Sequence, residues 1–210
     1  MWLSLREWTG RFAHFGISAI LAVEECDMGA LPKPMTIDEF LAWEERQELR
    51  HEYDGIQTYA MTGGTLAHAA IQINLTSALS RHLEGKPFRP FGSELKIRTQ
   101  AGIRYPDAFV TCTEGDLNAT IAPDPVVIFE ILSKSTAWQD LGVKTIEYRD
   151  MPSVRRYVVL QQTHRAAEVF YRTEEGEWVG EFAGADSVLA MPEIGIALPL
   201  SEFYRGLALP

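Results

Sequence analysis

The stretch Val126-Val127-Ile128-Phe129-Glu130-Ile131-Leu132 decides the fold. Apart from Glu130 it is entirely apolar, a pattern typical of a central strand that is buried on both faces. An ionised carboxylate in such surroundings needs a cation or hydrogen-bond donors to remain charged. The stretch therefore predicts the centre of a sheet and a first candidate for a functional residue.

Further strands are predicted on both sides of this stretch. Alternating or apolar runs occupy residues 94–99 and 103–111 before it, and residues 155–160, 167–171, 178–182 and 188–189 after it. Gly, Pro and acidic turns separate these runs. Residues 51–61 read as a hairpin around an Asp-Gly turn, and Glu52 lies on its first strand.

Three helices complete the pattern. Thr36 and Glu39 form a capping-box signature for a helix that runs to about residue 48. Residues 66–83 repeat apolar side chains at helical spacing, and residues 139–149 form the third helix. Helices alternating with strands predict one α/β domain with a mixed central sheet flanked by helices and a β-rich C-terminal part.

Length and composition fit a single globular domain. The chain has 210 residues, 46% of them hydrophobic and 23% charged. Two cysteines, Cys26 and Cys112, are too few for a disulfide framework and lack zinc-site spacing, which predicts a cytoplasmic protein. The apolar run at residues 17–23 is too short to span a membrane. We interpret residues 1–34 as an extension ahead of a working start at Met28 or Met35, and residues 35–210 as the domain.

The charge balance argues against simple accumulation on nucleic acid. The formal net charge is −10, and residues 1–34 contribute only −1, so the remaining domain carries −9. Binding by phosphate neutralisation requires the opposite sign. A nucleic-acid function would need a local basic stripe, a bound cation or a partner.

Three acids and one lysine suggest phosphodiester chemistry. Asp107 lies in a predicted strand, and with Glu130 and Glu52 it offers the carboxylate oxygens that Mg²⁺ prefers. Lys144 lies 14 residues beyond Glu130 on the following helix. If that helix crosses the strand end, its ammonium could orient a water or stabilise a phosphate.

Each of these residues also has a structural interpretation. Asp107 follows Pro106 and could form a turn. Glu52 could be a surface acid on a hairpin, and Lys144 could pair with Asp140 one helical turn earlier. His68 on the long helix could face a metal or be a helix-face histidine.

Candidates for substrate contact are fewer. Lys96 and Arg104, on neighbouring predicted strands, could form a phosphate-binding patch or be solvated strand edges. Ser133 could contact substrate or belong to a loop that leads to a helix cap.

The chain resembles the Uma-two family of endonucleases within the PD-(D/E)xK nuclease-like superfamily. The resemblance is carried by residues 104–107 (RYPD), residues 129–136 (FEILSKST), Asp140, Lys144, Tyr148 and residues 155–159 (RRYVV). It covers roughly Met35 to Leu207, including His68 and the segment that begins at Glu52.

The resemblance implies a restriction-endonuclease-like fold and a Mg²⁺ or Mn²⁺ site formed by Asp107 and Glu130 with Glu52. Leu132 occupies the position where the superfamily usually has lysine, so the basic role falls to Lys144, as is usual in the family. DNA is the implied substrate, and a homodimer is expected from the way such nucleases meet two strands.

The competing hypothesis is a non-catalytic, oligomeric binding module on the same fold. The acidity of the domain favours it, and we expect its partner surface at the apolar tail residues Phe203, Tyr204 and Leu207.

Overall fold

A computed structural model of the chain describes residues 33–112, 115–133 and 139–209. Its contacts divide the chain into Met1–Lys33 and Pro34–Pro210. The fold described below is that of the second unit. No helix among the described residues is both long enough and apolar enough to cross a membrane.

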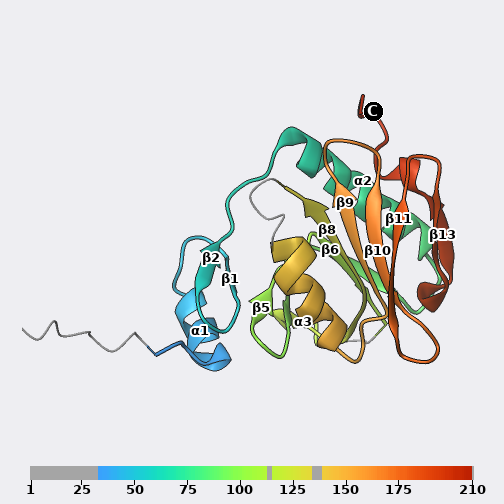
Figure 1. Ribbon diagram of the computed structural model, residues 1–210. Coiled ribbons are helices and arrows are strands. Elements are labelled where there is room, and N and C mark those ends of the chain that lie inside the picture. Colours follow the sequence, from blue (N-terminus) through green and yellow to red (C-terminus); the bar gives the residue numbers. More distant parts are fainter. Residues whose placement is uncertain (1–32, 113–114, 134–138, 210) are drawn as a thin grey trace, which may run out of the picture. The chain divides into compact units, whose positions relative to one another are not determined.

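A six-stranded sheet forms the core of this unit (Figure 1). In spatial order its strands are β11 (Trp178–Ala183), β10 (Ala167–Arg172), β9 (Arg156–Gln161), β8 (Pro125–Leu132), β6 (Ala108–Thr111) and β3 (Arg89–Gly92). The pair β8–β9 is parallel and the other pairs are antiparallel, so the predicted mixed sheet is confirmed. The stretch that contains Glu130 lies at its centre.

Two helices cover the opposite faces of this sheet (Figure 1). Val127, Phe129 and Ile131 of β8 pack in one core with α2 (Leu66–His82), whereas Ile128 packs in a second core with α3 (Lys144–Asp150). Because side chains alternate along a strand, Glu130 shares the α3 face with Ile128.

A second sheet has five strands, none of which pairs with a strand of the first sheet in the described residues. Its spatial order is β2 (Thr58–Ala60), β1 (His51–Tyr53), β5 (Ile103–Arg104), β4 (Lys96–Arg98) and β7 (Ile121–Ala122). Helix α1 (Ile37–Glu44) packs on it through Phe40, whose ring stacks on Tyr53 at 4.9 Å. The capping box is confirmed, with the backbone N–H of Glu39 donating to Thr36 and that of Thr36 donating to Glu39.

The third predicted helix begins differently from the expectation. Gln139–Val143 form a π-helical turn, and α3 begins only at Lys144. Such turns often occur at functional sites. The side chain of Asp140 lies outside the described residues, so its predicted pairing with Lys144 stays a prediction.

Two sequence interpretations are wrong. Residues 103–111 are not one strand, because Pro106 interrupts them and β5 and β6 join different sheets. Phe203 and Tyr204 are not an exposed partner surface, because both are fully buried against α2 and the six-stranded sheet. The tail also contains a two-stranded sheet of β12 (Val188–Met191) and β13 (Ile196–Pro199), together with the short helices η2 (Pro192–Ile194) and η3 (Leu200–Glu202).

Candidate functional site

Glu130 is held by two donors from α3. The residue is 3% exposed, and its Oε1 accepts hydrogen bonds from Lys144 Nζ and from the Tyr148 hydroxyl, both at 2.9 Å. Lys144 and Tyr148 are four residues apart and therefore share one helix face. Burial and the charges of Glu130 and Glu52 raise the pKa of Tyr148 well above its usual value, so its hydroxyl remains a donor.

Lys144 joins two carboxylates from different sheets. Besides Glu130 on β8, its ammonium contacts Oε1 of Glu52 on β1 at 3.3 Å. The lysine is only 4% exposed, so these contacts are poorly screened by water. The sequence expectation that this helix brings the ammonium to Glu130 agrees with the observed geometry.

Glu52 has further partners on β5 and just beyond it. Its Oε1 accepts a hydrogen bond from the backbone N–H of Tyr105 at 3.0 Å, and its Oε2 lies 3.4 Å from Arg104. It is 7% exposed. Glu52 is therefore a buried acid, not a solvated hairpin residue.

Asp107 immediately precedes β6. Its neighbour Ala108 pairs with Phe129, the residue before Glu130 on β8. The Oδ2 of Asp107 accepts the backbone N–H of Ile131 at 2.7 Å and lies 3.2 Å from His68 Nε2. The side chains of Asp107 and His68 are 14% and 18% exposed, so they are the more accessible part of the site.

Arg104 is enclosed by acids. It makes two hydrogen bonds with the carboxylate of Glu147, at 2.6 and 2.8 Å, and is 1% exposed. Burial opposes its charge, but the hydrogen bonds and charge of Glu147 outweigh burial and raise the pKa of Arg104 above its usual value. In this conformation the guanidinium fixes α3 to β5, and a phosphate would have to displace Glu147 to reach it.

Lys96 belongs to a neighbouring buried group. Its ammonium contacts Oε2 of Glu44 at 2.6 Å, while Oε1 of Glu44 accepts from the Tyr105 hydroxyl at 2.7 Å. Burial opposes ionisation of Glu44, but the hydrogen bonds from Lys96, Tyr105 and the backbone of His51 together lower the pKa of its carboxyl. Lys96 is thus an internal partner in this conformation, and Ser133 lies partly exposed just beyond β8.

Three acidic or phenolic members of these groups were not predicted as site residues. Glu147 and Tyr148 lie three and four positions after Lys144, so helical spacing alone could have identified them on its buried face. Glu44 lies in an acidic stretch at the end of α1, and no local pattern distinguishes it from the exposed Glu45.

The model of the Uma2 family, described as "Putative restriction endonuclease", matches residues 37–201. The chain belongs to the Uma2 family. This confirms the resemblance seen in the sequence, since Uma2 is the Uma-two family. The match spans every residue of the charged cluster described above.

Two proteins of Synechocystis are similar to this Uma2 chain. The uncharacterised protein slr1290 is 33% identical over 174 residues, which cover 81% of this chain and 92% of that protein. The uncharacterised protein sll1609 is 24% identical over 155 residues, covering 71% and 88% respectively.

A crystal structure of a "putative nuclease" from Anabaena variabilis is similar in fold. It aligns with a TM-score of 0.69 at 19% identity, over 81% of this chain and 97% of that one. At this identity the likeness concerns the fold alone. The restriction-endonuclease-like α/β fold expected from the sequence is confirmed.

The charge balance of the cluster suits a cation. Ion pairs join Glu52, Glu130, Glu147, Lys144 and Arg104, which together carry one net negative charge. Asp107, whose carboxylate contacts His68, adds a second when His68 is neutral. In the described ranges, no group of three or more acidic, histidine or cysteine side chains is arranged so that it could hold a metal ion. Mg²⁺ does not require one, because it often binds one or two carboxylates and completes its shell with water and phosphate oxygens.

Proposed function

We propose that this Uma2 protein is a metal-dependent nuclease that hydrolyses phosphodiester bonds of DNA. One observation carries the proposal: the Lys144 ammonium lies 2.9 Å from Glu130, a buried carboxylate near the end of the central strand β8. Together with Asp107, which immediately precedes the neighbouring strand β6, these residues would provide a metal site and a donor for a phosphate. The family description and the fold support a nuclease.

Asp107 and Glu130 would hold Mg²⁺ or Mn²⁺. The ion would supply Lewis-acid polarisation of the phosphate and a more acidic bound water. The donor set fits, since both groups are hard carboxylate oxygens in a cluster with excess negative charge. Glu52 assists from the far side of Lys144 by holding the ammonium in place.

Lys144 acts on the substrate as a hydrogen-bond donor. Its ammonium is held by Glu130 and Glu52, so it must exchange one of these contacts before it donates to a phosphate oxygen or an attacking water. In hydrolysis the water oxygen forms a bond to phosphorus and gives up a proton to solvent, the bond to the leaving oxygen breaks, and the leaving oxygen takes up a proton from solvent. Tyr148 keeps Glu130 oriented throughout.

Of the three ways to reconcile the acidity of the chain with DNA binding, the proposed function uses a bound cation. A net charge of −10 repels the phosphate backbone. We expect DNA to bind more tightly with Mg²⁺ than with EDTA. The non-catalytic alternative predicts no such dependence, and its expected partner residues Phe203 and Tyr204 are buried in the core.

A cleavage assay tests the proposal. Supercoiled DNA, single-stranded DNA and RNA are incubated with Mg²⁺ or Mn²⁺ and with the wild type, Glu130→Gln, Lys144→Met or Glu193→Gln. The first two variants should lose about 100-fold or more in rate. Glu193→Gln is the matched control, because it weakens an ion pair with Arg156 outside the cluster. Equal cleavage in all four proteins would contradict the assigned roles.

Metal binding has its own measurement. Mg²⁺ should raise the melting temperature of the wild type, and Asp107→Asn should abolish the increase while Glu193→Gln retains it. If no divalent ion changes the melting temperature of the wild type, the metal site is wrong and the binding module is the better hypothesis.

A further inference from the structure

Strand β11 is an open edge that lacks the usual protection. It pairs with β10 over six residues, and in the described part of the chain no strand pairs with its other side. Edge strands normally carry lysine, proline or a short length that prevents pairing with another chain. The other edge of the same sheet, β3, has Arg89 and Pro90. The edges of the five-stranded sheet, β2 and β7, have three and two residues.

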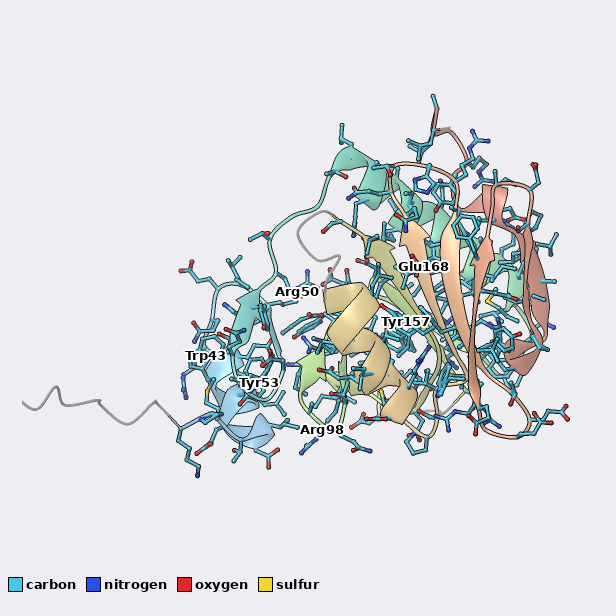
Figure 2. All side chains as sticks on the ribbon, viewed as in Figure 1. Trp43, Arg50, Tyr53, Arg98, Tyr157 and Glu168 are labelled. Carbon is cyan, nitrogen blue, oxygen red and sulfur yellow. The ribbon has the colours of Figure 1, made fainter. Side chains whose placement is uncertain are left out.

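The side chains of β11 expose apolar surface along this edge. Phe182 is 69% exposed and Val179 is 38% exposed, while Glu181 is the only charged residue of the strand. Glu168 of β10, which Figure 2 labels, pairs with Phe182 of β11. An exposed edge of this length with one charged residue and no lysine or proline is a template for a further strand.

The register of the hairpin shows which backbone groups face outward. The N–H of Thr173 donates to the carbonyl of Glu177 and closes the hairpin. Hydrogen-bonded and non-hydrogen-bonded pairs alternate in an antiparallel ladder. The N–H and C=O groups of Trp178, Gly180 and Phe182 therefore point away from β10, in a row centred on Gly180.

The outward N–H and C=O groups of one β11 can pair with those of a second β11 in the antiparallel direction. We propose that β11 pairs antiparallel with β11 of a second copy of the chain, with the two-fold axis at Gly180. Trp178 of one copy then stands opposite Phe182 of the other, twice, and the three outward residues of each strand exchange backbone hydrogen bonds. Glu181 stands opposite Val179, so the two acids avoid each other.

Gly180 suits the centre of such a contact. A Cβ at this position would lie 3.2 Å from the Phe170 ring beneath it, so the strand is already closely packed on its own sheet. Without a side chain, the two copies can approach at the axis while the aromatic pairs close on either side. The assembly is independent of the proposed chemistry, because none of its residues belongs to the charged cluster.

The test begins with the oligomeric state of the full chain. An edge contact is small, so light scattering should show a mass rising from 23.6 kDa toward twice that value at about micromolar concentration. Phe182→Lys should weaken the dimer at least about tenfold. Ile73→Lys is the matched control, because Ile73 is a similarly exposed apolar residue, 68% exposed, that lies on α2 and belongs to no strand, and it should leave the dimer unchanged.

Disulfide trapping then tests the register. In a background with Cys26 and Cys112 changed to serine, a mixture of Val179→Cys and Glu181→Cys proteins should form a covalent dimer, because residues that face each other in a non-hydrogen-bonded pair have Cα atoms about 4.5 Å apart. Val179→Cys alone should not, since that residue stands opposite position 181. A monomer at every concentration, a dimer insensitive to Phe182→Lys, or trapping at position 179 alone would each overturn the assembly.

Discussion

Replacing Lys144 with methionine should strongly destabilise the domain. The change leaves two carboxylates, with side chains 9% and 5% exposed, without the cation that Glu52 and Glu130 share. Removing one partner of a buried ion pair costs about 3–5 kcal/mol. Glu52 keeps Arg104 and Glu130 keeps Tyr148, so we expect the lower end, about 3 kcal/mol. For a domain of this size that is a fall in melting temperature of about 6–12 °C.

Urea unfolding with and without Mg²⁺ measures the effect. The midpoint of Lys144→Met should fall without a change in slope. Added Mg²⁺ should recover more stability in this variant than in the wild type, because a divalent cation bound by Glu130 supplies part of the missing positive charge. The control Lys86→Met removes an exposed lysine and should change stability by no more than about 0.5 kcal/mol.

Two results would refute this reasoning. If Lys144→Met unfolds at the same urea concentration as the wild type, the lysine does not compensate the buried acids. If the variant is destabilised as expected but Mg²⁺ restores nothing, the metal does not use these carboxylates, and the assignment of Glu130 as a ligand fails.

Three further changes have defined outcomes. Tyr148→Phe removes the hydroxyl donor to Glu130 but keeps the ring. Denaturation should show a free energy of unfolding lower by about 1 kcal/mol, and the DNA assay should show slower cleavage. The pKa of Glu44 is lowered in the folded state, so its contribution to stability is present above the usual carboxyl pKa of 4.5 and is lost as the pH falls through the lower, folded pKa. Glu44→Gln should therefore flatten the decline of stability on acidification, which urea midpoints from about pH 6 to 3 would measure. Arg104→Lys keeps the charge but loses the two-pronged contact with α3, and should lower the unfolding free energy by about 2 kcal/mol.

Much of the central architecture followed from local patterns. An apolar run interrupted by Glu130 predicted both the central strand and a charge partner, because burial of a lone carboxylate is unfavourable. The position of Lys144 on the next helix could be predicted for the same reason, since a crossover helix after a central strand packs across that sheet. These inferences depend on residues close in sequence.

Contacts between distant segments could not be predicted in this way. Arg104 looked like a candidate for phosphate binding, but it is enclosed by Glu147, 43 residues away. Pairing of this kind depends on how the two sheets pack together, and the hydrophobic periodicity of the sequence does not predict that packing. The same is true of Phe203, whose exposure was expected from its place near the chain end but which packs against Phe129.

The cluster that would carry out the chemistry is also the joint between two sheets. Tyr148 packs edge-on against Tyr157, which Figure 2 labels, with ring centroids 5.0 Å apart, while Lys144 links a strand of each sheet. A cell that carries a variant at Lys144 would therefore contain less of the protein, because losses of a few kcal/mol expose a chain to proteases. A phenotype in such a cell would report abundance and turnover together, and the two can be separated only by measuring the protein level alongside the cleavage of DNA.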